Sequence, residues 1–474
     1  MNLKILLKNK IFSYSLVTYL SQFLAFLNVF FISIYLDVYD FGVYGIISLF
    51  LSYLAYSNFG INYSFVNYLS LKSKRFQLSE KIYSNSVLFT ILIFFVIYFV
   101  LLLLIELISF DKQFLQIEPF FHYVLFVALL NNLNNIYIKL YRVYNNVNKL
   151  TFNQFFPPFL LFITLLYFSK NVNIYLILTV MLLSRTVCLL NFLIKTPLKF
   201  DFKFHYKILT ILLKKGMKLL FFNFSFGFIS IATLSIYSIL YSVEEFATYK
   251  LAFTIGTTPI LIGSAIENLI YPKVFNKISN LKNQLLTTFL KKISETYIAS
   301  IIILNLFIIF LFPLINIFFF KYTGIEFYLF SFLIGNIFLI KSYHFRILMV
   351  ANGYETKLAY FSLFSCLIVF LVSVIISHLK IQIYYQGFSY MIGSFFFLFL
   401  NQNYSKKFNI KFNLSLRLYL NSILVIIIGV IIYNKLIFPI YFVLPFLIFG
   451  NLKLFKSLTR FMLNVFTNNN LLKI

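Results

Sequence analysis

Arginine is scarce in this sequence, and three of its arginines lie where a charged side chain is costly. The chain contains six arginines among its 40 basic residues, and Arg142, Arg185 and Arg346 fall within or at the end of long apolar segments. A charge at the middle of a membrane-spanning helix costs roughly 2.5–3.5 kcal/mol on insertion scales, so it requires a reason. A guanidinium is a planar fork of donors that matches phosphate and pyrophosphate. These residues therefore predict an anion-binding site at membrane depth.

Arg185 is the strongest of these candidates. It lies near the middle of the apolar segment "LTVMLLSRTVCLLNFL", too deep for its side chain to reach the membrane surface easily. Two interpretations remain open at this point. Arg185 either faces an internal water-filled cavity, where it binds substrate, or forms a structural pair inside the protein.

Four further basic residues belong with it. Lys341 and His344 are three residues apart and therefore share one face of a predicted helix, and Arg346 lies closer to the inner end of that helix. The alternative is that these side chains extend to the cytoplasmic membrane surface. Arg142 ends another predicted helix together with Lys139, and this pair is alternatively a set of interfacial charges that fixes the topology.

Two other polar residues complete the candidate site. Glu267 is the only acid within the predicted helix 246–272, where it either binds a coupling cation or makes a structural pair. Asn62 belongs to a polar stripe along the predicted helix 42–70. Such stripes commonly join helices in membranes, but amide groups along a cavity would also suit a sugar chain.

Sequence motifs for catalysis are missing. There is no GxxxxGK[ST] for nucleotide binding, no HExxH and no nucleophile elbow, and the four histidines are scattered. Cys188 and Cys366 lie in separate apolar segments and predict buried thiols without a disulfide. We therefore expect no enzyme, no catalytic residue, no metal site and no cofactor.

The composition predicts the elements that must position these residues. The chain of 474 residues is 61% hydrophobic and only 11% charged, and long apolar segments recur from end to end. Such segments must be helices in lipid, because every backbone polar group there has to bond internally. We expect an all-α polytopic membrane protein with about fourteen transmembrane helices. The predicted helices are 13–36, 42–70, 82–108, 119–144, 150–169, 173–195, 217–241, 246–272, 293–320, 325–350, 356–379, 382–403, 415–434 and 436–457.

The charges predict the orientation of these helices. With the N-terminus in the cytoplasm, only 6 of the 40 basic residues face the other side, against 8 of the 13 acidic residues. This asymmetry follows the positive-inside rule and predicts a multi-pass protein of the cytoplasmic membrane with both termini in the cytoplasm. The net charge of +27 is spread over short loops, which argues against a nucleic-acid partner.

A repeated turn predicts two related halves. "YLDVYDFGVYG" at 35–45 resembles "LYSVEEFATYK" at 240–250, at an offset of 205, and a second pair of similar segments lies at 145–156 and 352–364. The offset covers six helices, which predicts parallel six-helix bundles related by a pseudo-two-fold axis. The alternative is that apolar sequences align weakly by composition alone. We expect an N-terminal bundle at 1–200, a C-terminal bundle at 201–405, and an extra helix pair and tail at 406–474.

The same residues carry a resemblance to a known family. Asp40-Phe41-Gly42-Val43-Tyr44, then Asn58-Phe59-Gly60, and later "YRVYNNVNKL" resemble motifs of the Wzx-type polysaccharide flippases. These flippases belong to the multidrug/oligosaccharidyl-lipid/polysaccharide exporter superfamily. The resemblance implies translocation of polyprenyl-pyrophosphate-linked oligosaccharide repeat units by alternating access through a cationic central cavity. It implies membrane lipid and a polysaccharide polymerase as partners. The substrate-binding residues would be Arg185, Lys341, Arg346, Arg142, His344 and Asn62.

Two other functions stay open from the sequence. Asp37 and Asp40 in the first external loop superficially resemble the acidic loop of a membrane glycosyltransferase or polymerase. A cation-coupled drug antiporter of the same superfamily would need acids that face its cavity, and Glu267 is the candidate.

Overall fold

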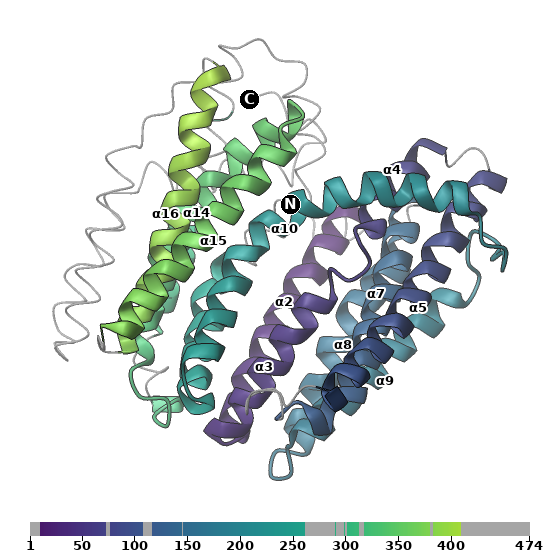
Figure 1. Cartoon of the computed structure of the whole chain (residues 1–474). Helices are drawn as coiled ribbons and strands as arrows, with labels where there is room; N and C mark the ends of the chain where they lie inside the picture. Colours follow the sequence, from purple (N-terminus) through teal and green to yellow (C-terminus); the bar gives the residue numbers. More distant parts are fainter. Residues whose placement is uncertain are drawn as a thin grey trace, which may run out of the picture. The chain divides into compact units, whose positions relative to one another are not determined.

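The computed structural model describes residues 10–72, 76–107, 116–144, 146–260, 301–311, 317–379 and 383–408, together with Leu290 and Ile298. Every regular element in this part of the chain is a helix (Figure 1), which confirms the all-α prediction. The helices are α2 (Lys10–Tyr35), α3 (Val38–Leu54), α4 (Ile61–Lys72), α5 (Phe76–Leu107), η1 (Glu118–Phe120), α7 (Phe121–Val143), α8 (Val147–Tyr167), α9 (Ile174–Leu193), α10 (Tyr206–Leu240), α14 (Ile325–Ala351), α15 (Glu355–His378), η2 (Ile383–Gln386), α16 (Gly387–Ser405) and η3 (Lys406–Phe408).

Seven of the described helices are long and apolar enough to cross a membrane, and shorter apolar helices accompany them. The chain is therefore a multi-pass membrane protein. The predicted helices 415–434 and 436–457 lie outside the described residues, as do much of 246–272 and parts of 293–320.

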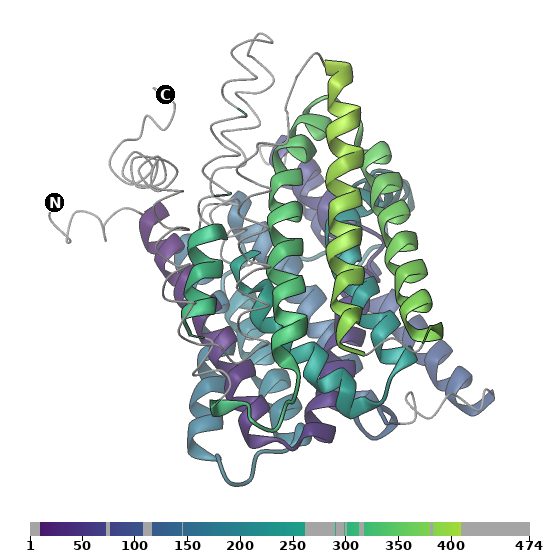
Figure 2. The same ribbon diagram turned by 90° about the vertical axis from the view of Figure 1, so that its left-hand side faces the viewer.

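The chain divides into two compact units. The first contains residues 1–224 and 241–247, and the second contains residues 225–240 and 248–474. In the first unit, α8 packs against α2 and α9, and α7 packs against α9. In the second unit, α16 packs between α14 and α15 (Figure 2). The predicted boundaries at 200 and 405 and the two-fold relation between halves stay predictions.

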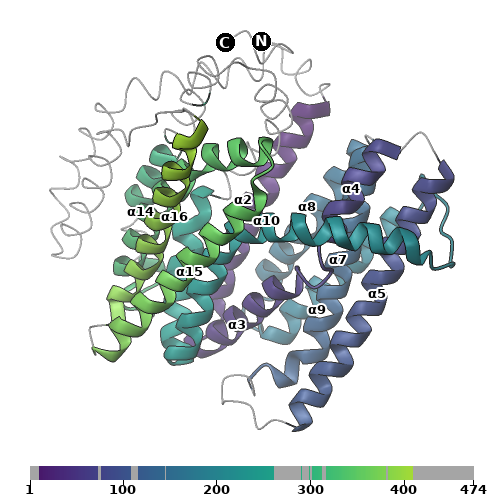
Figure 3. The same ribbon diagram turned by 45° about the horizontal axis from the view of Figure 1, so that its top comes forward.

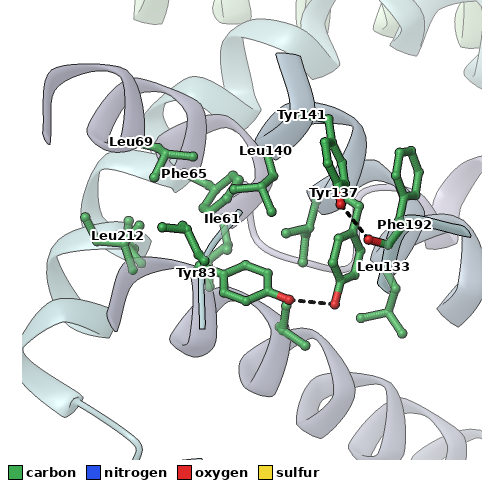
Figure 4. Packing of buried hydrophobic residues seen from close by; sticks show 14 of the residues in the cluster. Ile61, Phe65, Leu69, Tyr83, Leu133, Tyr137, Leu140, Tyr141, Phe192 and Leu212 are labelled. Atoms are coloured by element: carbon green, nitrogen blue, oxygen red, sulfur yellow. Dashed lines mark hydrogen bonds between the residues drawn. The ribbon is translucent and has the colours of Figure 1, made fainter. Parts of the chain in front are cut away.

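The core of the first unit gathers aromatic and aliphatic side chains from α4, α5, α7, α9 and the start of α10. Figure 4 shows Tyr83 and Tyr137 facing each other, with their hydroxyl oxygens 2.7 Å apart. The hydroxyl of Tyr141 donates to the carbonyl of Phe192 at 2.6 Å. Each buried phenol thus finds a hydrogen-bond partner, as burial of a polar group requires.

The prediction of one helix over 42–70 is wrong, because the backbone leaves the helix between α3 and α4. Phe59 has a φ of 49° and Gly60 a φ of 78°, which no helix accommodates. The side-chain oxygen of Asn58 accepts from the backbone N–H of Gly60 at 3.0 Å, which stabilises the turn. Asn132 of α7 donates to the carbonyl of Leu54 at 3.1 Å, which also accepts from the N–H and the hydroxyl of Ser57, so α7 adds a third donor at the end of α3.

The predicted cytoplasmic loop 196–216 is also partly helical, since α10 begins at Tyr206. Leu209, Leu212 and Gly216 are buried at spacings of three and four residues, which puts them on one helical face. Figure 1 and Figure 3 show the first half of α10 running across the neighbouring helices of its unit. The second part of this gap between predicted helices, one of the two largest, is therefore a helix that covers the bundle.

The two repeated turns, at 35–45 and 240–250, each begin a helix. Asp37 is the N-cap of α3, and its side chain accepts from the N–H of Asp40 at 2.7 Å. At the second turn Ser242 and Glu245 form a reciprocal capping box that starts the helix at 243–260. A Cβ added at Gly42 would lie 2.3 Å from the carbonyl oxygen of Val243. The two turns therefore pack directly against each other.

Candidate functional site

The first unit contains a cavity of about 550 Å³ between its helices. We call it the arginine cavity. Its lining residues on α2 extend from Tyr14 to Val29, so it follows the helix for about 22 Å at about 1.5 Å per residue. The lining residues are Tyr14, Ser21, Ala25, Asn28 and Val29 of α2, Tyr44 of α3, Asn135, Ile138 and Arg142 of α7, Leu150, Asn153, Gln154, Pro157, Pro158 and Leu161 of α8, and Met181, Ser184 and Arg185 of α9.

Arg185 lies on the wall of this cavity, near the middle of α9. Its guanidinium makes no hydrogen bond and no ion pair within the described part of the chain. Asn134 of α7 donates to its backbone carbonyl at 2.9 Å, which ties α9 to α7 at the depth of the arginine. In the described residues the structural-pair interpretation thus finds no partner for Arg185. Within that part of the chain, its charge is available to a ligand.

Arg142 lines the same cavity at the end of α7. Its Nη2 donates to the hydroxyl of Tyr14 at 3.3 Å, and its side chain is otherwise exposed. Lys139, which the sequence placed beside it, instead lies over the ring of Tyr63 at 4.4 Å. Arg142 therefore lines the same cavity as Arg185, whereas Lys139 is not among the lining residues.

Two prolines in α8 leave two backbone carbonyls on the cavity wall without a partner inside the helix. Pro157 and Pro158 have no N–H, so the carbonyls four residues earlier, of Asn153 and Gln154, lose their helical partners. Ser21 of α2 donates to the carbonyl of Gln154 at 2.7 Å, and the thiol of Cys188 of α9 reaches the carbonyl of Asn153 at 3.8 Å. Side chains of two neighbouring helices therefore replace the missing hydrogen bonds.

Two asparagines on the cavity wall have fixed amide orientations. The NH₂ group of Asn28 donates to the carbonyl of Pro158 at 2.8 Å, and that of Asn153 donates to the carbonyl of Lys149 at 2.8 Å. The side-chain oxygens of both residues are buried and have no partner in the described structure. The wall thus combines positively charged donors with amide acceptors.

Among the described residues, the lining contains no carboxylate. The sequence explains this, because Asp201 is the only acid between Glu118 and Glu244, and α2 contains none. His205 and Asp201 lie 3.4 Å apart outside the cavity. The electrostatic character of the cavity is therefore cationic.

The other predicted site residues lie elsewhere. Asn62 is buried in α4 and does not line the cavity. Lys341 is buried in α14 of the second unit and Arg346 is partly exposed on the same helix. His344 belongs to α14, and Glu267 lies outside the described residues. That these residues share a cavity with Arg185 stays a prediction.

Sequence reasoning missed several lining residues, although a signal was present. Tyr14, Ser21 and Asn28 recur every seven residues along α2, which places them on one stripe of that helix. A polar stripe at this spacing in the first apolar segment would have pointed to the cavity. Asn135, Asn153 and Gln154 carry no comparable periodicity.

No family model and no curated protein sequence matches the chain. Solved structures do match its fold. The lipid II flippase MurJ in an inward closed conformation has a TM-score of 0.69 at 15% identity, over 96% of this chain and 99% of that chain. An inward-facing multidrug resistance MATE family transporter of the MOP superfamily has a TM-score of 0.65 at 13% identity, over 83% and 97%.

A third match is a MOP superfamily transporter from Pyrococcus furiosus whose binding pocket has reverse polarity. Its TM-score is 0.57 at 13% identity, over 84% of this chain and 95% of that chain. At these identities the likeness concerns the fold. The chain therefore shares its fold with these solved structures.

Proposed function

We propose that this protein is a flippase that moves a polyprenyl-pyrophosphate-linked oligosaccharide across the cytoplasmic membrane. The observation that carries the proposal is the arginine cavity, where Arg142 and Arg185 line one hollow whose described lining holds no carboxylate. The proposal also places both termini in the cytoplasm, as the distribution of lysines predicts. It describes a transporter and assigns the protein no catalytic residue.

The chemistry of the cavity supports an anionic headgroup as the transported group. A pyrophosphate that leaves water loses its hydration, and this loss is the main barrier to crossing a membrane. Guanidinium groups replace the lost water with charge-assisted, bidentate hydrogen bonds. Arg185 is placed at mid-helix, and the described part of the chain offers no carboxylate beside it, so its charge is available for this purpose.

The neutral polar groups support a sugar chain next to the anion. Hydroxyl groups of Tyr14, Tyr44 and Ser184 and the amides of Asn135 and Gln154 line the cavity. Such groups both donate and accept hydrogen bonds, as the hydroxyls of a saccharide do. The lipid tail needs no such contacts and would stay in the bilayer during transport.

The structural neighbours agree with this substrate class. One of them is a flippase for lipid II, and another has a binding pocket of reversed polarity. A cation-coupled drug antiporter would need a cavity that attracts cations, which two arginines oppose. Lys341, Arg346, His344 and Asn62 would complete the substrate path in this proposal, and Glu267 would bind a coupling cation or form a structural pair. Nothing observed points to a polymerase partner.

The proposal is tested by transport in proteoliposomes that contain a fluorescent polyprenyl-pyrophosphate saccharide. Reduction of the fluorophore from outside measures how much lipid has changed leaflet. We expect Arg185→Ala to abolish translocation and Arg185→Lys to retain a small part, because lysine keeps the charge but lacks the fork. Lys214→Ala is the matched control, since Lys214 is an exposed cation of α10 that does not line the cavity.

Binding can be measured separately because the chain contains no tryptophan. Met181→Trp places a single fluorophore on the cavity wall, one helical turn from Arg185. Inorganic pyrophosphate should change its emission, and the change should disappear when Arg185→Ala is added. Full translocation by Arg185→Ala, or transport of a cationic drug in place of the saccharide lipid, would refute the proposed substrate.

A further inference from the structure

The segment between α9 and α10 is fastened to the surface of α5 by three backbone hydrogen bonds. The N–H of Lys199 donates to Glu80 Oε1 at 3.3 Å, and the N–H of Asp201 donates to Ser84 Oγ at 2.8 Å. A third bond, from the N–H of His205 to Asn85 Oδ1, measures 2.9 Å. The segment therefore follows the first turns of α5 in a defined position.

The aromatic residues of this segment point in two directions. Phe200 contacts the ring of Tyr83 in the core, with ring centroids 5.9 Å apart. Phe202 and Phe204 are instead 84% and 43% exposed. Because the backbone is held by α5, these two rings form a fixed end wall beside the helix.

That wall closes one end of an apolar groove of about 620 Å³. The groove is distinct from the arginine cavity and shares no lining residue with it. From Leu88 to Leu103 it extends along α5 for about 22 Å. Its lining residues are Leu88, Ile91, Leu92, Phe95, Val96, Phe99, Val100, Leu103, Phe202 and Phe204.

Basic residues lie at the same end of the groove as Phe202 and Phe204. Lys81 is exposed and lies seven residues before Leu88, so it shares the groove-lining face of α5. Lys203 is exposed between the two phenylalanines of the wall. The groove thus has a cationic end and an apolar length.

The two acidic side chains nearby, Glu80 and Asp201, accept hydrogen bonds from backbone N–H groups. Glu80 accepts from the N–H of Lys199, and Asp201 accepts from the N–H of Lys203 at 3.0 Å and lies 3.4 Å from the ring of His205. Lys199 and Lys207 add two more exposed cations to the same segment. The local charge therefore favours an anion.

We propose that this groove is a binding site for an anionic glycerophospholipid of the cytoplasmic leaflet. Its phosphate would lie between Lys81 and Lys203, and one acyl chain would follow α5 from Leu88 toward Leu103. The site is built on α5 and the segment 199–205, whereas the arginine cavity is built on other helices. The occupant is thus a resident membrane lipid and not the tail of the transported substrate.

The experiment uses single tryptophans in the otherwise tryptophan-free chain. Phe99→Trp places the fluorophore in the groove at a 61% exposed position, and Leu183→Trp places it on α9 at a 52% exposed position outside the groove. Each variant is reconstituted in phosphatidylcholine vesicles with a minor fraction of phosphatidylglycerol. Bromine on the acyl chains of one lipid at a time quenches a neighbouring tryptophan.

We expect brominated phosphatidylglycerol to quench Phe99→Trp well beyond its share of the membrane, and Leu183→Trp only in proportion. A lysine near an anionic phosphate contributes about fivefold in affinity at low salt. Adding Lys81→Gln and Lys203→Gln should therefore remove the preference at Phe99→Trp. The control pair Lys214→Gln and Lys218→Gln removes equal charge from α10 and should leave the preference intact.

Three results would overturn the inference. They are equal quenching at both tryptophans, a preference that survives loss of Lys81 and Lys203, and displacement of phosphatidylglycerol by added polyprenyl pyrophosphate. The last result would identify the occupant as the substrate's tail. The inference does not depend on the proposed function, because Arg185→Ala should abolish translocation and still show the lipid preference.

Discussion

Gly60 and Gly216 pack closely against each other. Alanine substitutions there can separate two causes of destabilisation, a strained backbone conformation and a steric clash. Gly60 has a φ of +78°, and a Cβ there would lie 2.1 Å from the carbonyl oxygen of Gly216. Gly216 lies within α10 without a special φ, and its own Cβ would lie 2.7 Å from the carbonyl oxygen of Gly60. Gly353 has a φ of +75° with nothing within 4 Å.

Each alanine substitution therefore measures a different combination of costs. Gly353→Ala should lower the free energy of unfolding by about 1–2 kcal/mol, the cost of a Cβ in the left-handed region. Gly216→Ala forces a backbone clash worth about 1–3 kcal/mol, from which the better helix propensity of alanine recovers about 1 kcal/mol. Gly60→Ala combines both costs and should lose about 2–5 kcal/mol.

The measurement is reversible unfolding of the purified protein in mixed detergent micelles, followed by far-ultraviolet circular dichroism. All three variants lose the same flexible residue from the unfolded chain, so that contribution cancels in the comparison. Should Gly60→Ala prove no more destabilising than Gly353→Ala, then the close packing of α4 on α10 contributes nothing and the reasoning fails.

Three further predictions concern single contacts. Ser21→Ala leaves the carbonyl of Gln154 without a partner and should lower the free energy of unfolding by about 1–2 kcal/mol in the same assay, whereas an unchanged value would mean that water replaces the hydroxyl. Tyr83→Phe and Tyr137→Phe should show a coupling energy of about 0.5–1.5 kcal/mol in a double-mutant cycle, and strict additivity would contradict the hydrogen bond between them. The pKa of Asp201 is lowered, first by a backbone N–H that donates to its carboxylate. Because the pKa of Asp201 is lower in the folded protein, its carboxylate stabilises the fold fully above the pKa of the unfolded chain, about 4. This stabilisation is lost as the pH falls through the pKa of the folded protein. Asp201→Asn should remove this part of the pH dependence of thermal stability, and an identical acid profile would refute the assignment.

Much of the fold followed from hydropathy, because backbone polar groups in lipid leave helices as the only solution for long apolar segments. The break at 55–60 did not follow, although Asn58 and Gly60 had been singled out as a motif. The turn is held by Asn58 and by Asn132 of another helix, which accepts from the amide of Asn58 and donates to the carbonyl of Leu54. A contact between residues that are distant in sequence cannot be predicted from hydropathy averaged over a local window.

Some residues of the candidate site could likewise be predicted from the sequence, and others could not. Arg185 could be found because a charge at mid-helix is costly whatever surrounds it. The role of Ser21 could not be found, because it depends on a carbonyl that Pro158 frees on a helix more than a hundred residues away in sequence. The cost of a buried charge can be recognised within one sequence segment. The lining of a cavity can be predicted only when it is known which segments pack against each other.

The proline-interrupted wall has a consequence for how such a transporter would be driven. Because α2 and α9 supply the partners that α8 lacks, sliding α8 past either helix would break these hydrogen bonds, which favours movement of the three helices as one piece. An anion held by Arg185 would then meet the same wall in every stage of transport. A ligand that binds two conformations equally well shifts no equilibrium between them. The bias that turns exchange into directional movement must therefore arise outside this wall.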